Sequence, residues 1–333
     1  MAIAPAIALV GARPARAEPP SRAASTARLA ALAPADDARR AIAIGAGGEV
    51  YEPDGKGAWV HRLPSTTADR LVSAGRSAGP GSPVVALGDG VVYRLAANGW
   101  SAIRLAQKGK AILGAGARSL AAVGRQLFTL DALTRGEPTK LALAPANIVA
   151  IGAGARGVVI ATDSGAWRLD GTQLVELEGA PSRMRLVSDR WAIVDRGAID
   201  LAAGQTASRP ARPRAKPGAK PGKAAVKIAA SVIPWPAGLT IGVAAVAPDG
   251  ALVAIGSTRA GLELVTLRGG KLARDPLGVT GTAVGLVVDR QGRATVALSD
   301  GRIAVRDKAG WTTTEVTDEA TAEHPGAPPA PSS

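Results

Sequence analysis

A short unit recurs along the whole chain, and this repetition constrains the fold more than any other feature of the sequence. The clearest copy, Pro83 to Leu105, reads PVVALGDGVVYRLAANGWSAIRL. Two apolar runs flank the turn Gly88-Asp89-Gly90, and a third run opens at Trp100 after a second turn. Short apolar runs joined by turn residues that tolerate positive φ predict a meander of antiparallel strands. The preceding run, Arg70 to Ala74, supplies a fourth strand.

The chain contains seven such units, and the position of Gly88 can be identified in each of them. From the first unit to the last, the residues at this position are Gly45, Gly88, Gly124, Thr162, Asp195, Gly256 and Ser299. Their successive spacings are 43, 36, 38, 33, 61 and 43 residues. The long spacing contains the run Gln205 to Lys227, and it falls to 38 when those 23 residues are removed. Seven units of about forty residues predict an all-β fold, a seven-bladed β-propeller with four antiparallel strands in each blade.

Aromatic residues recur at matching places in these units. Trp59, Trp100 and Trp311 open the fourth strand of their units, and Tyr51, Tyr93, Phe128 and Trp167 lie on the third strand. Because the same positions are aromatic in blade after blade, we expect these side chains to pack between neighbouring blades.

Two segments resemble known propeller repeats. VVIATDSGAWRLDG, from Val158 to Gly171, resembles the repeat of the sensor regions of two-component regulators, and ALGDGVVYRLAANGW, from Ala86 to Trp100, resembles the Asp-box repeat of neuraminidase-type propellers and WD-like repeats. In the Asp-box pattern Asp163, Gly165 and Trp167 match, whereas Ala166 stands where that pattern has Thr. The resemblance implies a propeller, a fold that carries many unrelated activities.

The predicted propeller spans residues 27–316 and is flanked by segments of a different character. Residues 1–17 contain an apolar run that ends in Ala15-Arg16-Ala17, which favours a signal peptide cleaved after Ala17. An Ala-rich N-terminus on a cytoplasmic protein is the alternative interpretation. Residues 18–26 are expected to be a spacer and 317–333 a disordered tail, and no stretch of the mature chain predicts a transmembrane segment.

The run 205–227 is expected to be a disordered basic insertion in blade five. Its positive side chains are Arg209, Arg212, Arg214, Lys216, Lys220, Lys223 and Lys227. Pro or Gly separates most of them, which favours an extended, polyproline-like chain. After the insertion, Ala224 to Ala230 is expected to return as the last strand of blade five. The formal net charge of +13 is therefore concentrated in this segment, which is either a polyanion-binding element or a solvated linker.

Catalytic chemistry has little support in the sequence. The chain has no Cys and only His61 and His324, so thiolate and most imidazole chemistry is excluded. The first strands, which line the central channel of a propeller, contain Arg28, Arg70 and Arg185 but no carboxylate, His or Tyr. General acid–base catalysis needs titratable groups within hydrogen-bond reach of the substrate. We therefore expect no metal and no cofactor.

The candidate binding residues lie in loops on one face. Asp89, Asp163, Asp195 and Asp300 occupy equivalent second turns, where they either build tight hairpins or form a ring of carboxylates for a divalent cation. Trp235, between Pro234 and Pro236, lies in a connection between blades on the same face. A Pro-stiffened Trp is either an interface anchor or a cover for the gap between blades five and six.

These observations predict an exported, non-enzymatic propeller, periplasmic or secreted, that acts as a scaffold for a protein or another component of the cell envelope. Two alternatives stay open. One is a glycosidase or lyase that uses acids on the loop face, and the other is a protein that binds nucleic acid, another anionic polymer or a membrane surface through the basic insertion.

Overall fold

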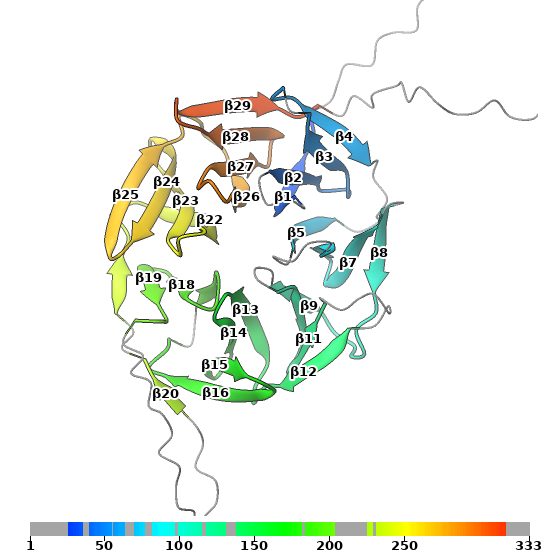
Figure 1. Cartoon of the computed structure of the whole chain (residues 1–333), viewed down its shortest axis with the longest axis vertical. Helices are drawn as coiled ribbons and strands as arrows, with labels where there is room; N and C mark the ends of the chain where they lie inside the picture. The colour runs from blue at the N-terminus through cyan, green and yellow to red at the C-terminus, as the bar shows by residue number, and fades with distance from the viewer. Residues whose placement is uncertain are drawn as a thin grey trace, which may run out of the picture.

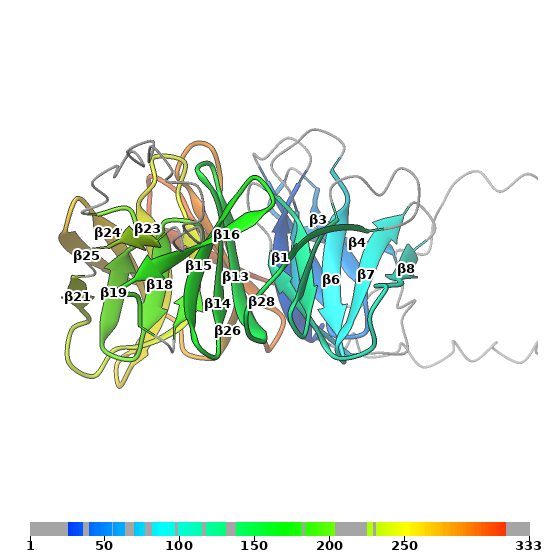
Figure 2. The same cartoon turned by 90° about the horizontal axis from the view of Figure 1, so that it is seen from below.

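Seven β-sheets are arranged as blades around a central axis in the computed structural model (Figure 1). The structure describes residues 26–317 except 36–39, 55, 64–69, 77–81, 97–98, 115–117, 131–137, 182–183, 204–224 and 229–230. The predicted fold is confirmed: each blade has four antiparallel strands in chain order, and the described residues contain no helix. In the side view the strands stand nearly upright across the disc, with loops at its two faces (Figure 2). No membrane-spanning helix is found among the described residues.

The strands of the first four blades follow the predicted units. Blade one contains β1 (Leu29–Pro34), β2 (Ala41–Gly45), β3 (Val50–Pro53) and β4 (Trp59–Leu63). Blade two contains β5 (Leu71–Arg76), β6 (Val84–Gly88), β7 (Val91–Ala96) and β8 (Gly99–Ile103). Blade three contains β9 (Ala111–Gly114), β10 (Leu120–Val123), β11 (Gln126–Thr129) and β12 (Thr139–Leu143). Blade four contains β13 (Ile148–Gly154), β14 (Gly157–Thr162), β15 (Gly165–Asp170) and β16 (Gln173–Glu178).

The last three blades are built in the same way. Blade five contains β17 (Arg185–Leu186), β18 (Trp191–Val194), β19 (Gly197–Asp200) and β21 (Val232–Pro234). Blade six contains β22 (Thr240–Val246), β23 (Leu252–Thr258), β24 (Gly261–Arg268) and β25 (Lys271–Pro276). Blade seven contains β26 (Ala283–Val288), β27 (Ala294–Leu298), β28 (Arg302–Arg306) and β29 (Trp311–Glu315). The first strand of each blade lies nearest the axis (Figure 1).

The prediction for the last strand of blade five was wrong. The outer strand of that blade is β21, which pairs with β19. The segment Ala225–Lys227 forms β20 instead, and β20 pairs in parallel with β16 on the outer edge of blade four. The last three residues of the predicted disordered insertion are therefore a strand. The apolar Ile228 explains this placement, because its side chain is buried in the core between blades four and five.

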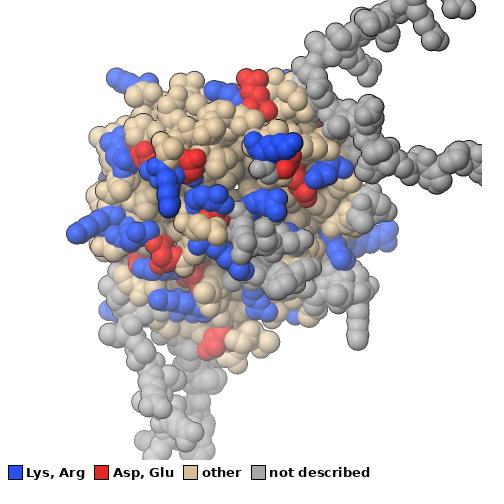
Figure 3. Space-filling view, turned by 45° about the horizontal axis from the view of Figure 1, so that its top comes forward, with Lys and Arg blue, Asp and Glu red and all other residues tan. Residues whose placement is uncertain are grey.

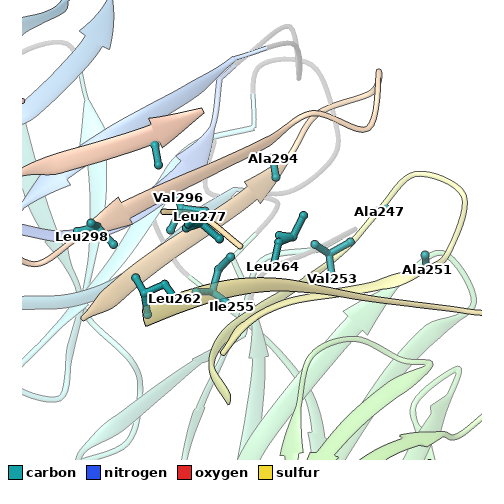
Figure 4. Packing of buried hydrophobic residues seen from close by; sticks show 11 residues of the cluster. Ala247, Ala251, Val253, Ile255, Leu262, Leu264, Leu277, Ala294, Val296 and Leu298 are labelled. Atoms are coloured by element: carbon teal, nitrogen blue, oxygen red, sulfur yellow. The ribbon is translucent and has the colours of Figure 1, made fainter. Parts of the chain in front are cut away.

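The hydrophobic core lies between blades. In the junction of blades six and seven, side chains from β23 and β24 point toward those of β27, as Figure 4 shows for Val253, Ile255, Leu264 and Val296. The predicted role of the recurrent aromatic residues is confirmed at such junctions. Trp100 of blade two, for example, packs on residues of blade one and donates an indole N–H bond of 2.7 Å to the carbonyl oxygen of Gly48.

The ring closes without an exchange of strands between its ends, because blades one and seven each come from one continuous stretch of chain. Thr26 and Thr317 form an antiparallel bridge, and the N–H of Ala27 donates to the carbonyl oxygen of Val316 at 3.0 Å. Val316 and Ala27 are both fully buried in a cluster shared by blades seven and one. The closure therefore depends on one backbone bridge and on a shared apolar core.

The two faces of the disc carry different turns. The loop face has the second turn of each blade, which holds Asp89, Asp163, Asp195 and Asp300, and the connections between blades, which include Trp235. The opposite face has the first and third turns. β19 ends at Asp200 on this opposite face.

Candidate functional site: a cleft between blades five and six

A cleft of about 470 Å³ opens on the loop face between blades five and six. Three segments line it: Met184 and Arg185 at the start of β17, Ile193 to Asp195 at the end of β18, and Trp235 with Leu239 to Ile241 from the end of the connection and the start of β22. Its walls combine apolar side chains with one guanidinium group, one carboxylate and the side chain of Thr240. Concave apolar sites with a few converging polar groups are typical of ligand sites.

Trp235 forms part of the apolar wall of this cleft. Its backbone N–H donates to the carbonyl oxygen of Arg196 at 3.0 Å, which anchors the connection to the second turn of blade five. Its ring packs on the core that contains Trp191 and Leu252. The indole Nε1 is buried and has no hydrogen-bond partner among the described residues, so the surface that Trp235 offers to the cleft is carbon. Trp235 therefore covers the junction of the two blades and lines the cleft as well.

Arg185 lies where the cleft meets the central channel, and its side chain lines both. Its Nη1 donates to the carbonyl oxygen of Gly242 at 2.6 Å and its Nη2 donates to that of Ile241 at 3.3 Å. The side chain contacts solvent, yet protein surrounds it in the middle of the ring, and this desolvation lowers the pKa of the guanidinium. Its charge is held by carbonyl dipoles, and no acidic side chain of the described residues pairs with it.

Asp195 supplies the carboxylate of the cleft. It is exposed in the second turn of blade five and lines the same cleft as Arg185 and Trp235. Of the five predicted loop-face residues, the structure thus brings together Asp195 and Trp235. An acid and a base across an apolar cleft provide two polar groups of opposite sign, which suits a ligand with its own separated polar groups.

The other three aspartates lie in other blades. Asp89 is exposed with a φ of 46°, the left-handed conformation that a tight hairpin needs, and Asp163 is exposed in its turn. Asp300 forms an ion pair with Arg302 at 2.6 Å, and this hydrogen bond lowers the pKa of its carboxyl group. No group of three acidic or histidine side chains close enough to share a metal ion is found in the described part of the chain.

The predicted polyanion-binding residues lie almost entirely outside the described residues. Lys227 is the exception: it is exposed on β20, where its Cα pairs with that of Glu178. The other six basic residues of the insertion fall within 204–224. His61, one of the two histidines, stacks on Tyr51 with ring centroids 5.1 Å apart and belongs to the outer part of blade one.

Sequence reasoning missed the cleft itself. Arg185 was predicted as a channel residue and Trp235 as a loop residue, with no expected relation between them. The signal that could have found the cleft is positional. Arg185 opens the inner strand of blade five, and Trp235 directly follows the outer strand of the same blade, so both lie at the loop face next to blade six.

No family model matches the chain, and no curated protein matches its sequence. Three solved structures are similar to it in fold. YCF48 from Cyanidioschyzon merolae has a TM-score of 0.53 and 15% identity, with 88% of this chain and 96% of that chain covered. A streptogramin B lyase has a TM-score of 0.56 and 12% identity, with 83% of this chain and 92% of that chain covered. The WD40 β-propeller domain of Doa1 has a TM-score of 0.54 and 12% identity, with 86% of this chain and 95% of that chain covered. At these identities the likeness shows the fold alone, and the chain is a seven-bladed β-propeller.

Proposed function

We propose that the protein is an exported scaffold that binds a segment of a partner protein in the cleft between blades five and six. The observation that carries this proposal is the position of Trp235, a Pro-flanked aromatic residue that forms the wall of a loop-face cleft. Aromatic residues at the centre of an interface contribute much of the binding free energy, because large rigid side chains lose little conformational entropy.

The dimensions and chemistry of the cleft support a peptide segment as the ligand. A volume of about 470 Å³ accommodates one or two side chains of a partner rather than a whole element. Trp235, Leu239 and Ile193 provide apolar contact, while Arg185 and Asp195 provide polar groups at its sides. A partner loop with an apolar residue next to a charged one has the complementary pattern.

Positive side chains predominate on the described surface of the propeller. On the face seen in Figure 3, Lys and Arg cover more of the surface than Asp and Glu do. Ion pairs such as Arg274 with Glu263 at 2.6 Å neutralise only some of these charges. The test of the cleft therefore includes high salt, which screens contacts made through this positive surface.

Export is part of this proposal and has its own test. The apolar run that ends at Ala15-Arg16-Ala17 supports cleavage after Ala17. N-terminal sequencing of the protein purified from its native cell is expected to begin at Glu18. A mature chain that retains residues 1–17 would contradict export by this route without affecting the cleft.

The binding site is tested by photo-crosslinking in the native cell. A photoreactive amino acid replaces Asp195, which is exposed at the cleft, and in a matched control it replaces Leu143, a 59% exposed residue on the outer strand of blade three. We expect a specific adduct only from position 195. The adduct should persist at high salt and disappear when Trp235→Ala is added. Equal adducts from both positions, or an adduct from position 195 that Trp235→Ala leaves unchanged, would overturn the proposal.

A further inference from the structure

The central channel of the ring is a second cavity, which meets the cleft at Arg185. It has a volume of about 540 Å³, and all seven inner strands contribute to its wall. Most of the side chains in the lining are aliphatic, including Leu32, Leu113, Ile151 and Leu286. Among the described residues that line it, Ser73 is the only hydroxyl and Arg185 the only charged group. The channel therefore combines a wall of mostly aliphatic side chains with polar surface and, among the described residues that line it, a single positive charge.

Part of this apolar wall is in contact with water. Val72 is 57% exposed, although it lies on an inner strand. It is the extra residue of a β-bulge between Leu71 and Ser73, and it lines the channel. A β-bulge changes the direction in which a side chain points, and bulges are frequent next to functional sites. Each square ångström of such surface that a ligand removes from water contributes about 25 cal/mol to binding.

The positive charge of Arg185 means that the channel favours a ligand with a negatively charged group. A guanidinium has five N–H donors, and the two bonds to Gly242 and Ile241 leave donors that the described residues do not use. Among the described residues, no carboxylate lines the channel to neutralise the charge. A carboxylate bound to the remaining donors would form charge-assisted hydrogen bonds, which are about twice as strong as those between neutral groups.

We propose that the central channel binds an aliphatic monocarboxylate, with the carboxylate on Arg185 and the hydrocarbon chain against the inner strands. The aliphatic side chains of the wall contact the chain, and the charge of Arg185 selects an anionic head group over a neutral or cationic one. This inference is independent of the partner site, although Arg185 borders both cavities.

The test uses the full-length protein and three probes with the same chain, namely decanoate, decanol and decyltrimethylammonium, titrated below their micelle concentrations by calorimetry. We expect decanoate to bind about tenfold or more tightly than decanol, and the cationic probe to bind more weakly than either. Arg185→Met should weaken decanoate binding by about tenfold or more and leave decanol binding unchanged. Arg185→Lys, which keeps the charge, should restore part of the affinity for decanoate.

A second variant tests the cavity without touching the charge. Val72→Trp places a large ring in the channel from a position that is already exposed, and it should abolish the binding of decanoate and decanol alike. Leu143→Trp, at the 59% exposed position on β12 outside the channel, is the matched control and should change neither. Trp235→Ala should also leave decanoate binding unchanged, which separates this proposal from the partner site.

The inference would be overturned by the absence of decanoate binding to the wild type, by decanoate binding that Val72→Trp leaves intact, or by equal affinity for the anionic and cationic probes. An acetylated apolar tripeptide with a free carboxylate that binds more tightly than decanoate would also overturn it, because the channel would then select a peptide terminus.

Discussion

The indole N–H of Trp191 donates a hydrogen bond of 2.9 Å to the carbonyl oxygen of Gly250 across the junction of blades five and six. Trp191 is only 1% exposed. Arg190 reinforces the contact, because its guanidinium lies 5.0 Å from the Trp191 ring and pairs with Asp200 at 2.7 Å. This bond lies on the opposite face, so the junction is tied there and opens into the cleft on the loop face.

Trp191→Phe is expected to destabilise the propeller by about 1–3 kcal/mol, because it removes apolar contact and leaves the carbonyl oxygen of Gly250 with only the longer bond from Arg190 at 3.3 Å. Urea denaturation followed by circular dichroism measures the loss. Trp311→Phe is the matched control, since the Nε1 of Trp311 has no hydrogen-bond partner among the described residues. Equal losses in the two variants would show that the bond to Gly250 contributes nothing.

Gly301→Ala is expected to weaken the closure of the ring. A Cβ at this position would lie 2.3 Å from the carbonyl oxygen of Ala27, and its φ is +91°. Gly292→Ala is the matched control, because Gly292 has a similar φ of +79° and the new methyl group would have open space around it. The control should therefore lose only about 1 kcal/mol from backbone strain, and Gly301→Ala clearly more. Thermal unfolding of both variants tests this, and equal melting temperatures would contradict it.

Ile228→Ala is expected to cost about 2–5 kcal/mol, because Ile228 is 5% exposed in the core between blades four and five. Lys227→Ala, one residue earlier and exposed, should be neutral within about 0.5 kcal/mol. Chemical denaturation measures both free energies of unfolding. If the two variants unfold alike, β20 and Ile228 do not contribute to the stability of the folded ring.

Asp300 is expected to give a small stabilisation that depends on pH. Its pKa lies below the ordinary value of 3.8 because Arg302 donates hydrogen bonds to it. A lowered folded-state pKa means that the stabilisation is fully present above pH 3.8 and is lost as the pH falls through the folded value. The side chain is 47% exposed, so the effect should be at most about 1 kcal/mol.

Denaturation of the wild type and of Asp300→Asn from neutral pH down to acid measures this effect. The wild type should be the more stable protein above pH 3.8, and the difference should vanish at lower pH. A difference that stays constant over the whole range would show that ionisation of Asp300 is not its source.

The blades could be predicted from sequence because their signals are local. An apolar run, a turn such as Asp89-Gly90 and a second apolar run determine a hairpin within about fifteen residues, and seven such hairpins determine the architecture. The last strand of blade five could not be predicted, because Ala225–Lys227 and Val232–Pro234 are both short apolar segments. The buried place that Ile228 occupies between two blades decides between them, and that place exists only in three dimensions.

The candidate site was predictable in its parts but not in its assembly. The Pro residues beside Trp235 and the turn at Asp195 marked both residues for attention. Their common cleft depends on how blade six packs against blade five, which no local pattern of the sequence encodes. The same holds for Arg185, whose carbonyl partners Ile241 and Gly242 lie more than fifty residues away in the chain.

The closure between Ala27 and Val316 means that the position of the chain ends is not needed to define the ring. Blades one and seven are continuous segments, and the two ends of the described chain meet in one antiparallel bridge. A circular permutant that links residue 317 to residue 26 and opens at Gly269-Gly270, a turn with room around both glycines, would keep every strand pair. The seam at blades seven and one is thus one junction among seven equivalent ones.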